Sequence, residues 1–341
     1  MKLKNWAGYQ RGVNLGGWLS QCCHEKNHYE TFICEENIKQ IKSWGIDHVR
    51  LPIDYNLLQN ADGEFIEANF CYIDNCAEWC KNAGLNLILD LHKTAGYSFD
   101  KGENETGFFG NPKYEKMFID LWCEFARRYG KLGDRVAFEL LNEITDPGYN
   151  PDWQRISAQT IKAIRGICPT VKILIGGYWN NSAAAVKDLI LPPDENIVYN
   201  FHCYSPLCFT HQGAYWVEAM PADFRLDYPF SFDDPKAAGA KKAYEIMKME
   251  WPKGATGLDA IDREIFEAVK VAQERGVMLY CGEYGVIDLA KPESTLGWFK
   301  EINSVFEKYG IGRACWNYKE KDFGISGAHY DSIRSELLKY L

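Results

Sequence analysis

Eight short apolar segments alternate with longer amphipathic segments from one end of the chain to the other. The apolar segments have the length of buried strands. The amphipathic segments repeat apolar residues at spacings of three and four, as in Ile119, Trp122, Phe125 and Ala126, which predicts helices. The predicted strands are residues 11–15, 46–51, 85–90, 135–140, 171–175, 197–201, 277–281 and 312–315. The predicted helices are residues 35–44, 70–83, 112–129, 153–166, 182–188, 258–275, 295–309 and 332–341.

Strict alternation of strands and helices predicts an α/β fold with a parallel sheet and right-handed crossovers, and eight such units allow the sheet to close into a (β/α)8 TIM barrel. The alternative is an open, doubly wound sheet. The glycine pair Gly16-Gly17 after the first strand lacks the third glycine of a dinucleotide-binding motif, which disfavours that alternative. We therefore predict one catalytic domain over residues 1–341.

Residues 206–256 interrupt the alternation between the sixth strand and the sixth helix. The segment is rich in aromatic residues and proline, and a structureless loop of this length is improbable in a compact domain. We expect a small helical insertion that includes a helix at 236–247, after Pro235. Loops that follow barrel strands lie on the catalytic face, so the insertion is expected to form a lid over a cleft.

The formal net charge of −9 argues against a nucleic-acid or anionic-membrane partner. No apolar run is long enough to span a bilayer, and we expect a monomer. The first ten residues lack the apolar core of a signal peptide, which predicts a cytoplasmic protein; a secreted protein whose signal had been removed would look the same. The 12 cysteines show no disulfide or zinc-finger spacing and are expected to be reduced thiols.

Two glutamates, Glu143 and Glu283, follow or end apolar strands. Hydrolysis of an acetal through a covalent intermediate needs two carboxyl groups, one to protonate the leaving oxygen and one to attack the anomeric carbon. Two strands of one barrel would present both glutamates at the same mouth. A single glutamate at the end of a strand is most simply interpreted as a partner in a surface ion pair. Two of them in one barrel predict a glycosidase active site.

Further polar and aromatic residues follow the predicted strands and should gather at the same mouth. They are Arg50, His92, Asn142, His202, Tyr204 and Trp316. Glu139 shares strand parity with Glu143 and is expected to point into the barrel, where a buried carboxylate needs a cation such as Arg50 or His48. We interpret Glu139 as structural.

With these residues in place, the chain resembles glycoside hydrolase family 5, the cellulase-type retaining glycosidases, and in particular its clostridial endoglucanases. The resemblance runs from Gly12–Trp18 to Cys315–Tyr318 and includes Leu-Asn142-Glu143 and Gly-Glu283-Tyr-Gly-Val. It implies that Glu143 is the acid/base and Glu283 the nucleophile. It also implies that Asn142 contacts the substrate 2-hydroxyl, that Arg50 and Tyr204 orient Glu283, and that His92, His202 and Trp316 build the reacting subsite. Many relatives carry His or Gly where this chain has Lys93.

The function expected from the resemblance is retaining, endo-acting hydrolysis of β-1,4 bonds in cellulose-like or mixed-linkage β-glucan. The alternatives within the family are a β-mannanase or glucomannanase and an exo-β-glucosidase or exo-β-1,3-glucanase. Trp179, Tyr215 and Trp216 are candidates for lining the cleft. A non-catalytic sugar-binding barrel would have no use for two close carboxylates, and a Schiff-base aldolase at Lys93 is disfavoured. No metal and no cofactor is expected, because the sequence shows no metal-ligand spacing.

Overall fold

A computed structural model describes residues 2–100, 102–217, 220–231, 239, 245 and 257–341. Eight strands form a closed barrel in the order of the sequence, and every neighbouring pair, β8 with β1 included, is parallel. The strands are β1 (Arg11–Asn14), β2 (His48–Asp54), β3 (Asn86–Lys93), β4 (Val136–Glu139), β5 (Lys172–Ile175), β6 (Ile197–His202), β7 (Met278–Tyr284) and β8 (Gly312–Cys315). The predicted (β/α)8 barrel is confirmed, and the open sheet is excluded.

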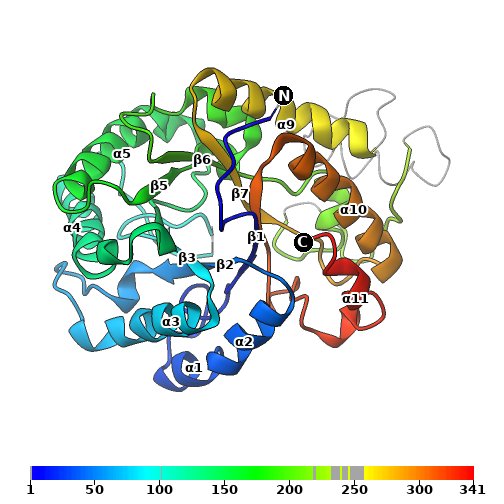
Figure 1. Cartoon of the computed structure of the whole chain (residues 1–341), viewed down its shortest axis with the longest axis horizontal. Helices are drawn as coiled ribbons and strands as arrows, with labels where there is room; N and C mark the ends of the chain where they lie inside the picture. Colours follow the sequence, from blue (N-terminus) through cyan, green and yellow to red (C-terminus); the bar gives the residue numbers. More distant parts are fainter. Residues whose placement is uncertain (1, 101, 218–219, 232–238, 240–244, 246–256) are drawn as a thin grey trace.

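Helices surround the strands in a ring (Figure 1). The α-helices are α1 (Lys26–Thr31), α2 (Glu35–Ser43), α3 (Phe70–Ala83), α4 (Pro112–Tyr129), α5 (Asn150–Arg165), α6 (Tyr178–Asn181), α7 (Leu207–Thr210), α9 (Gly257–Glu274), α10 (Pro292–Tyr309) and α11 (Arg334–Leu337). Short 3-10 helices are η1 (Tyr55–Leu57), η2 (Glu67–Asn69), η3 (Gly130–Arg135), η4 (Pro147–Tyr149), η5 (Ala183–Asp188) and η7 (Ala328–Tyr330).

Local sequence explains where the long helices begin and end. Asn111 caps α4 by accepting a hydrogen bond from the Lys113 amide, and Pro112 occupies the first turn. Gly84 closes α3 in the left-handed conformation. The prediction at 182–188 was wrong in type, because that segment forms a 3-10 helix preceded by the four-residue turn α6. Helix α1 was missed, since its sequence lacks an apolar stripe.

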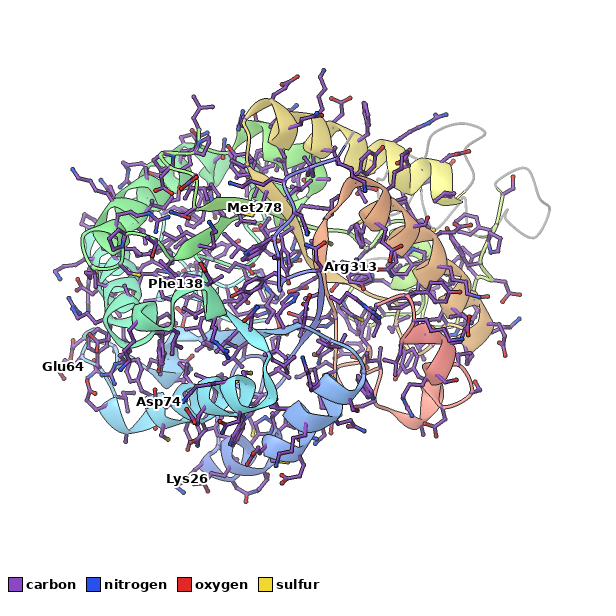
Figure 2. All side chains as sticks on the ribbon, in the orientation of Figure 1. Lys26, Glu64, Asp74, Phe138, Met278 and Arg313 are labelled. Atoms are coloured by element: carbon purple, nitrogen blue, oxygen red, sulfur yellow. The ribbon has the colours of Figure 1, made fainter. Side chains whose placement is uncertain are left out.

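Two apolar layers hold the barrel. Side chains of one strand face alternately outward and inward, so Phe138 packs toward the helices while Ala137 faces the barrel interior. The interior is closed at one end by Trp6 and Tyr9, whose rings stack with centroids 4.0 Å apart. Figure 2 shows Phe138 beside the barrel strands and Lys26 at the outer rim of the molecule.

Polar side chains replace apolar ones in the barrel interior toward the carboxyl ends of the strands. Backbone register sets Asn14 beside Arg50, and Asp90 beside Glu139. These four residues and Asn200 are all fully buried. This polar layer supports the side chains that lie at the mouth above it.

The proposed lid over 206–256 is described only in part, and the predicted helix at 236–247 lies outside the described residues apart from 239 and 245. Tyr228 is buried against Phe209 and donates a hydrogen bond to Glu301, so it packs within the protein. All twelve cysteines are free thiols. Among helices of the described residues, none is both long and apolar enough to cross a bilayer.

Candidate active site

Glu143 and Glu283 meet at the carboxyl-terminal mouth of the barrel although they are far apart in sequence. Glu143 follows β4, and Glu283 lies near the end of β7. One carboxylate oxygen of each glutamate and one ring nitrogen of His202 all lie within 4.8 Å of one another. Retaining glycosidases hold their carboxyl groups about 5–5.5 Å apart, whereas inverting enzymes need about 6.5–9.5 Å to admit a water molecule. The spacing therefore suits a retaining site.

Two donors fix the carboxylate of Glu283. Arg50 donates from Nη1 to Oε1 at 2.7 Å, and the Tyr204 hydroxyl donates to Oε2 at 3.0 Å. Burial and the neighbouring carboxylates raise the pKa of Tyr204 well above its ordinary value, so its hydroxyl keeps its proton. A carboxylate held by a cation and a phenol is fixed in orientation, as an attacking group requires.

Arg50 is the hub of the buried polar layer. Its guanidinium binds Glu139 in a bidentate pair at 2.7 and 2.8 Å. It also donates to Asn14 and Asn142, and Nη2 lies 3.0 Å from Asp90 Oδ2. The expectation that Glu139 points into the barrel toward Arg50 agrees with this geometry, whereas His48 contacts Asp47 and Tyr280 instead.

One guanidinium faces three carboxyl groups in this cluster. Burial by itself would lower the pKa of Arg50, but the attraction of Asp90, Glu139 and Glu283 raises it well above its ordinary value. Burial raises the pKa of Asp90 to about 7 and also raises that of Glu139, in both cases against the opposing pull of Arg50. The layer is thus stable only while the single cation is present.

We expect Arg50→Met to lower the free energy of unfolding by about 3–5 kcal/mol, since carboxyl groups would remain buried without a cation. Without Arg50 the folded-state pKa values of these carboxyls would rise further above their unfolded values of about 4. The destabilisation should therefore be small below about pH 4, grow as pH rises from there toward the folded pKa values, and level off above them. Urea unfolding at pH 5 and pH 8 measures the difference.

The exposed pair between Arg127 and Glu124 offers a matched control for this substitution. Arg127→Met should change the unfolding free energy by less than about 1 kcal/mol at both pH values. An Arg50→Met protein that is as stable as wild type at pH 8, or equally destabilised at both pH values, would contradict the structural importance assigned to the cluster.

Glu143 sits in a different environment from Glu283. Its Oε1 lies 2.8 Å from His202 Nδ1, and its Oε2 accepts a hydrogen bond from Asn180 Nδ2 at 2.8 Å. Burial is the largest influence on the pKa of Glu143 and raises it; the Asn180 hydrogen bond, then His92 and Arg50, oppose that rise. Burial also lowers the pKa of His202 to about 4, so this imidazole is neutral at neutral pH. A carboxyl group with a raised pKa suits a general acid.

Asn142 and His92 complete the inner wall. The Oδ1 of Asn142 is occupied by Arg50, but its buried Nδ2 has no hydrogen-bond partner in the described part of the chain. A buried, unpaired donor is costly unless a ligand satisfies it. His92 Nδ1 lies 2.6 Å from Asp90 Oδ2, and its ring is stacked with that of Trp316, interplanar angle 4°. Both residues are tied to the buried polar layer, Asn142 through Arg50 and His92 through Asp90.

The three candidate cleft aromatics are exposed. Trp179 has 56% of its surface exposed and precedes Asn180, the residue that contacts Glu143. Trp216 is 44% exposed, and its ring packs edge-on against His211, which in turn contacts Tyr204. Tyr215 is 85% exposed and contacts Trp216. One residue, Asn180, separates Trp179 from Glu143. Two residues, His211 and Tyr204, separate Trp216 from Glu283, and Tyr215 lies beyond Trp216.

Sequence reasoning missed several polar residues that hold the site together. They are Asn14, Asp90, Asn180, Asn181 and Asn200. Strand parity could have found Asp90 and Asn200, which point inward with His92 and His202. Asn180 and Asn181 lie on a turn with left-handed backbone conformation, which no simple sequence pattern predicts.

Lys93 follows His92 in the sequence, but its amine forms ion pairs with carboxylates other than Glu143 and Glu283. Its Nζ is 2.6 Å from Glu103 and 3.6 Å from Asp54. The amine is held as a cation by these carboxylates, because their attraction raises its pKa against the lowering effect of burial. A protonated lysine cannot attack a carbonyl carbon, so the geometry gives no support to a Schiff-base reaction.

Glu143, His202 and Glu283 form the one group of metal-type ligands found among the described residues. Their nitrogen and oxygen donors are those that bind divalent ions. His202 contacts Glu143, and Glu283 accepts hydrogen bonds from Arg50 and Tyr204. These contacts explain why the two carboxylates and the imidazole lie close together.

Comparisons with known proteins decide the family. The sequence pattern of the family described as Cellulase (glycosyl hydrolase family 5) matches residues 9–322. The chain belongs to glycosyl hydrolase family 5. This family 5 hydrolase shares 47% identity over 309 residues with cellodextrinase A of Ruminococcus flavefaciens, covering 90% of this chain and 85% of that protein. It shares 38% identity over 337 residues with endoglucanase C of Acetivibrio thermocellus, covering 98% of each.

Solved structures agree with the fold of this family 5 hydrolase. Endoglucanase Cel5A from the hyperthermophilic Thermotoga maritima superposes with a TM-score of 0.77 at 23% identity, covering 98% of this chain and 97% of that one. At this identity the likeness shows the fold alone. Family membership and the relatives together make the chain a glycoside hydrolase.

Proposed function

We propose that this family 5 glycoside hydrolase is an endo-acting β-1,4-glucanase that cleaves cellulose-like or mixed-linkage β-glucan with retention of anomeric configuration. The observation that supports this proposal most directly is the close approach of Glu143 and Glu283: a carboxylate oxygen of one lies within 4.8 Å of a carboxylate oxygen of the other. Family membership supports the retaining mechanism. The names of the relatives, endoglucanase and cellodextrinase, support a β-1,4-glucan substrate.

In the first step Glu143 protonates the glycosidic oxygen while Glu283 attacks the anomeric carbon, forming a glycosyl-enzyme. Burial raises the pKa of Glu143, which favours the protonated form that donates the proton, and the hydrogen bonds from Arg50 and Tyr204 hold the carboxylate of Glu283 in position. The unpaired Nδ2 of Asn142 is positioned to donate to the 2-hydroxyl of the reacting sugar.

In the second step water replaces the leaving alcohol. Glu143, now ionised, takes a proton from that water as it attacks the anomeric carbon, and Glu283 departs. The stacked His92–Trp316 pair gives the reacting sugar an apolar floor. The exposed rings of Trp179 and Trp216 are proposed to extend this surface to neighbouring sugars, and the insertion that carries Trp216 is proposed to border the cleft.

A second candidate is hydrolysis confined to short cello-oligosaccharides. It is favoured by the 47% identity to a protein named cellodextrinase A. Both candidates use the same two glutamates, so they differ in chain-length preference rather than in chemistry. We also propose that the protein acts as a monomer, because one chain supplies both carboxyl groups; gel filtration tests this.

Product analysis distinguishes these possibilities. The substrates are barley β-glucan, carboxymethyl cellulose, glucomannan, laminarin, xylan and cellotetraose. An endo-β-1,4-glucanase lowers the viscosity of the first two rapidly and releases little glucose. Activity on cellotetraose without loss of viscosity would favour the oligosaccharide candidate. Glucose released from laminarin alone would overturn both.

Trp216→Ala should weaken binding of long oligosaccharides by roughly 1–3 kcal/mol if the indole stacks on a sugar, a magnitude taken from stacking of bases on aromatic side chains. A short aryl glycoside does not extend that far and should be hydrolysed almost normally. KM for cellopentaose and for an aryl cellobioside, with the melting temperature, measures the difference. Equal losses on both substrates together with a lower melting temperature would assign Trp216 to packing on His211.

A further inference from the structure

Three consecutive residues in the loop after β5 adopt the left-handed backbone conformation. Trp179, Asn180 and Asn181 have φ angles of 51°, 56° and 54°. Asparagine tolerates this region, but a bulky residue such as tryptophan is uncommon there. Strained backbone persists where surrounding contacts enforce it, commonly at functional sites. Three consecutive left-handed residues therefore indicate that surrounding contacts hold this turn in place.

The turn delivers two amide side chains onto the site. Asn180 donates from Nδ2 to Glu143 Oε2 at 2.8 Å, while its backbone amide donates to the Ile144 carbonyl at 2.9 Å. Asn181 Nδ2 lies 3.4 Å from His202 Nε2. Both ends of the pair formed by Glu143 and His202 are thus held from one turn.

Gly176 makes this arrangement possible. A Cβ at that position would lie 2.2 Å from Asn181 Oδ1, so only glycine leaves space for the amide. Asn181 is fully buried, and Trp179, at the other end of the turn, is exposed. The turn therefore joins the protein interior to an exposed aromatic ring through Asn180.

We propose that Asn180 is a positioning residue for the acid/base Glu143, and that the left-handed turn at residues 179–181 exists to aim its amide at that carboxylate. The inference rests on the role proposed above for Glu143. Asn180 holds Oε2 while His202 holds Oε1, so the carboxyl plane is fixed from two sides. Fixing that plane keeps the acidic proton in line with the glycosidic oxygen.

The contact also sets the proton affinity of Glu143. An N–H donor favours the ionised form of a carboxyl group, and Asn180 opposes the upward effect of burial on the pKa of Glu143. The same carboxyl must be protonated in the first step and ionised in the second, so this opposition keeps it able to do both. Other titratable and charged groups around Glu143 are His92, Arg50, Asp90, Tyr97, His202, Tyr204 and Glu283.

Asn180→Gly tests the proposal, because glycine accepts a φ of 56° and removes only the amide. The pKa of Glu143 should rise, so the alkaline limb of kcat/KM for cellotetraose, whose cleavage needs the acid, should move to higher pH. Misplacement of the acid should lower kcat/KM on cellotetraose, which needs acid assistance, by about 10- to 100-fold. The activated aryl glycoside should lose much less.

Trp179→Gly is the matched control, since it relieves the same turn but keeps the amide of Asn180. It should leave the alkaline limb of kcat/KM for cellotetraose at the same pH as in wild type, whatever loss of the exposed ring does to the KM. Asn180→Asp is a second variant that preserves shape and replaces the donor with a carboxylate. It should move the limb further upward through like-charge repulsion.

A readout independent of turnover separates this inference from the proposed function. Carbon-13 NMR of carboxyl-labelled glutamates gives the titration of Glu143, assigned by its loss in Glu143→Gln. An upward shift in Asn180→Gly supports the inference even if wild type fails to hydrolyse β-1,4-glucan. An unmoved titration and alkaline limb in both Asn180 variants, or an equal shift in Trp179→Gly, would overturn it.

Discussion

Glu283→Ala is expected to lower turnover by on the order of 10⁴-fold or more while leaving the fold intact. Alanine has no oxygen that can attack the anomeric carbon, so no glycosyl-enzyme can form. The fold should survive because Arg50 keeps its bidentate pair with Glu139 and its ion pair with Asp90. Turnover of an aryl cellobioside, circular dichroism and the melting temperature should be measured on the same preparation.

Glu307→Ala is the matched control, because Glu307 is 67% exposed and lies away from the mouth on α10. It should retain wild-type activity. Substantial activity in purified Glu283→Ala would show that Glu283 is not the nucleophile.

Glu143→Ala should fail in a different way. Activated aryl glycosides need little acid assistance, so formation of their glycosyl-enzyme should be nearly normal, and the intermediate should accumulate for lack of a base. Added azide needs no general base. It should therefore accelerate turnover and give the β-glycosyl azide, since it displaces Glu283 from the α-linked intermediate.

The two glutamate variants control each other. In Glu283→Ala, azide can only attack the β-glycoside directly, so any azide product should have the α configuration. Absence of azide acceleration in Glu143→Ala on an activated substrate, or α-glycosyl azide from that variant, would show that Glu143 is not the acid/base.

The barrel was predictable from the sequence because its signals are local and repeated. Each strand is a short apolar run, and each long helix carries a stripe or a terminal signal, such as Pro112 at the start of α4. The pairing of Glu143 with Glu283 was predictable for a topological reason: parallel strands of one barrel end at one mouth. Arg50 and Glu139 followed from strand parity and from the need of a buried carboxylate for a cation.

The parts that were missed depend on tertiary contacts. The left-handed turn at Trp179 and Asn180 is imposed by contacts with Glu143 and Ile144, which no local propensity encodes. The helix predicted at 182–188 failed because the segment is short, so alanine-rich sequence formed a 3-10 helix against β6 instead. Asp90 was overlooked because its role, holding His92 and Arg50, appears only when β2 and β3 lie side by side.

The central claim is that Glu283 forms a covalent glycosyl-enzyme with Glu143 as its acid/base partner. Incubation with 2,4-dinitrophenyl 2-deoxy-2-fluoro-β-cellobioside slows the second step and should trap that intermediate. Mass spectrometry of the intact protein should show one fluorocellobiosyl group, and peptide mapping should place it on Glu283. An adduct on Glu143, or no adduct together with release of α-configured product from a natural substrate, would contradict the account.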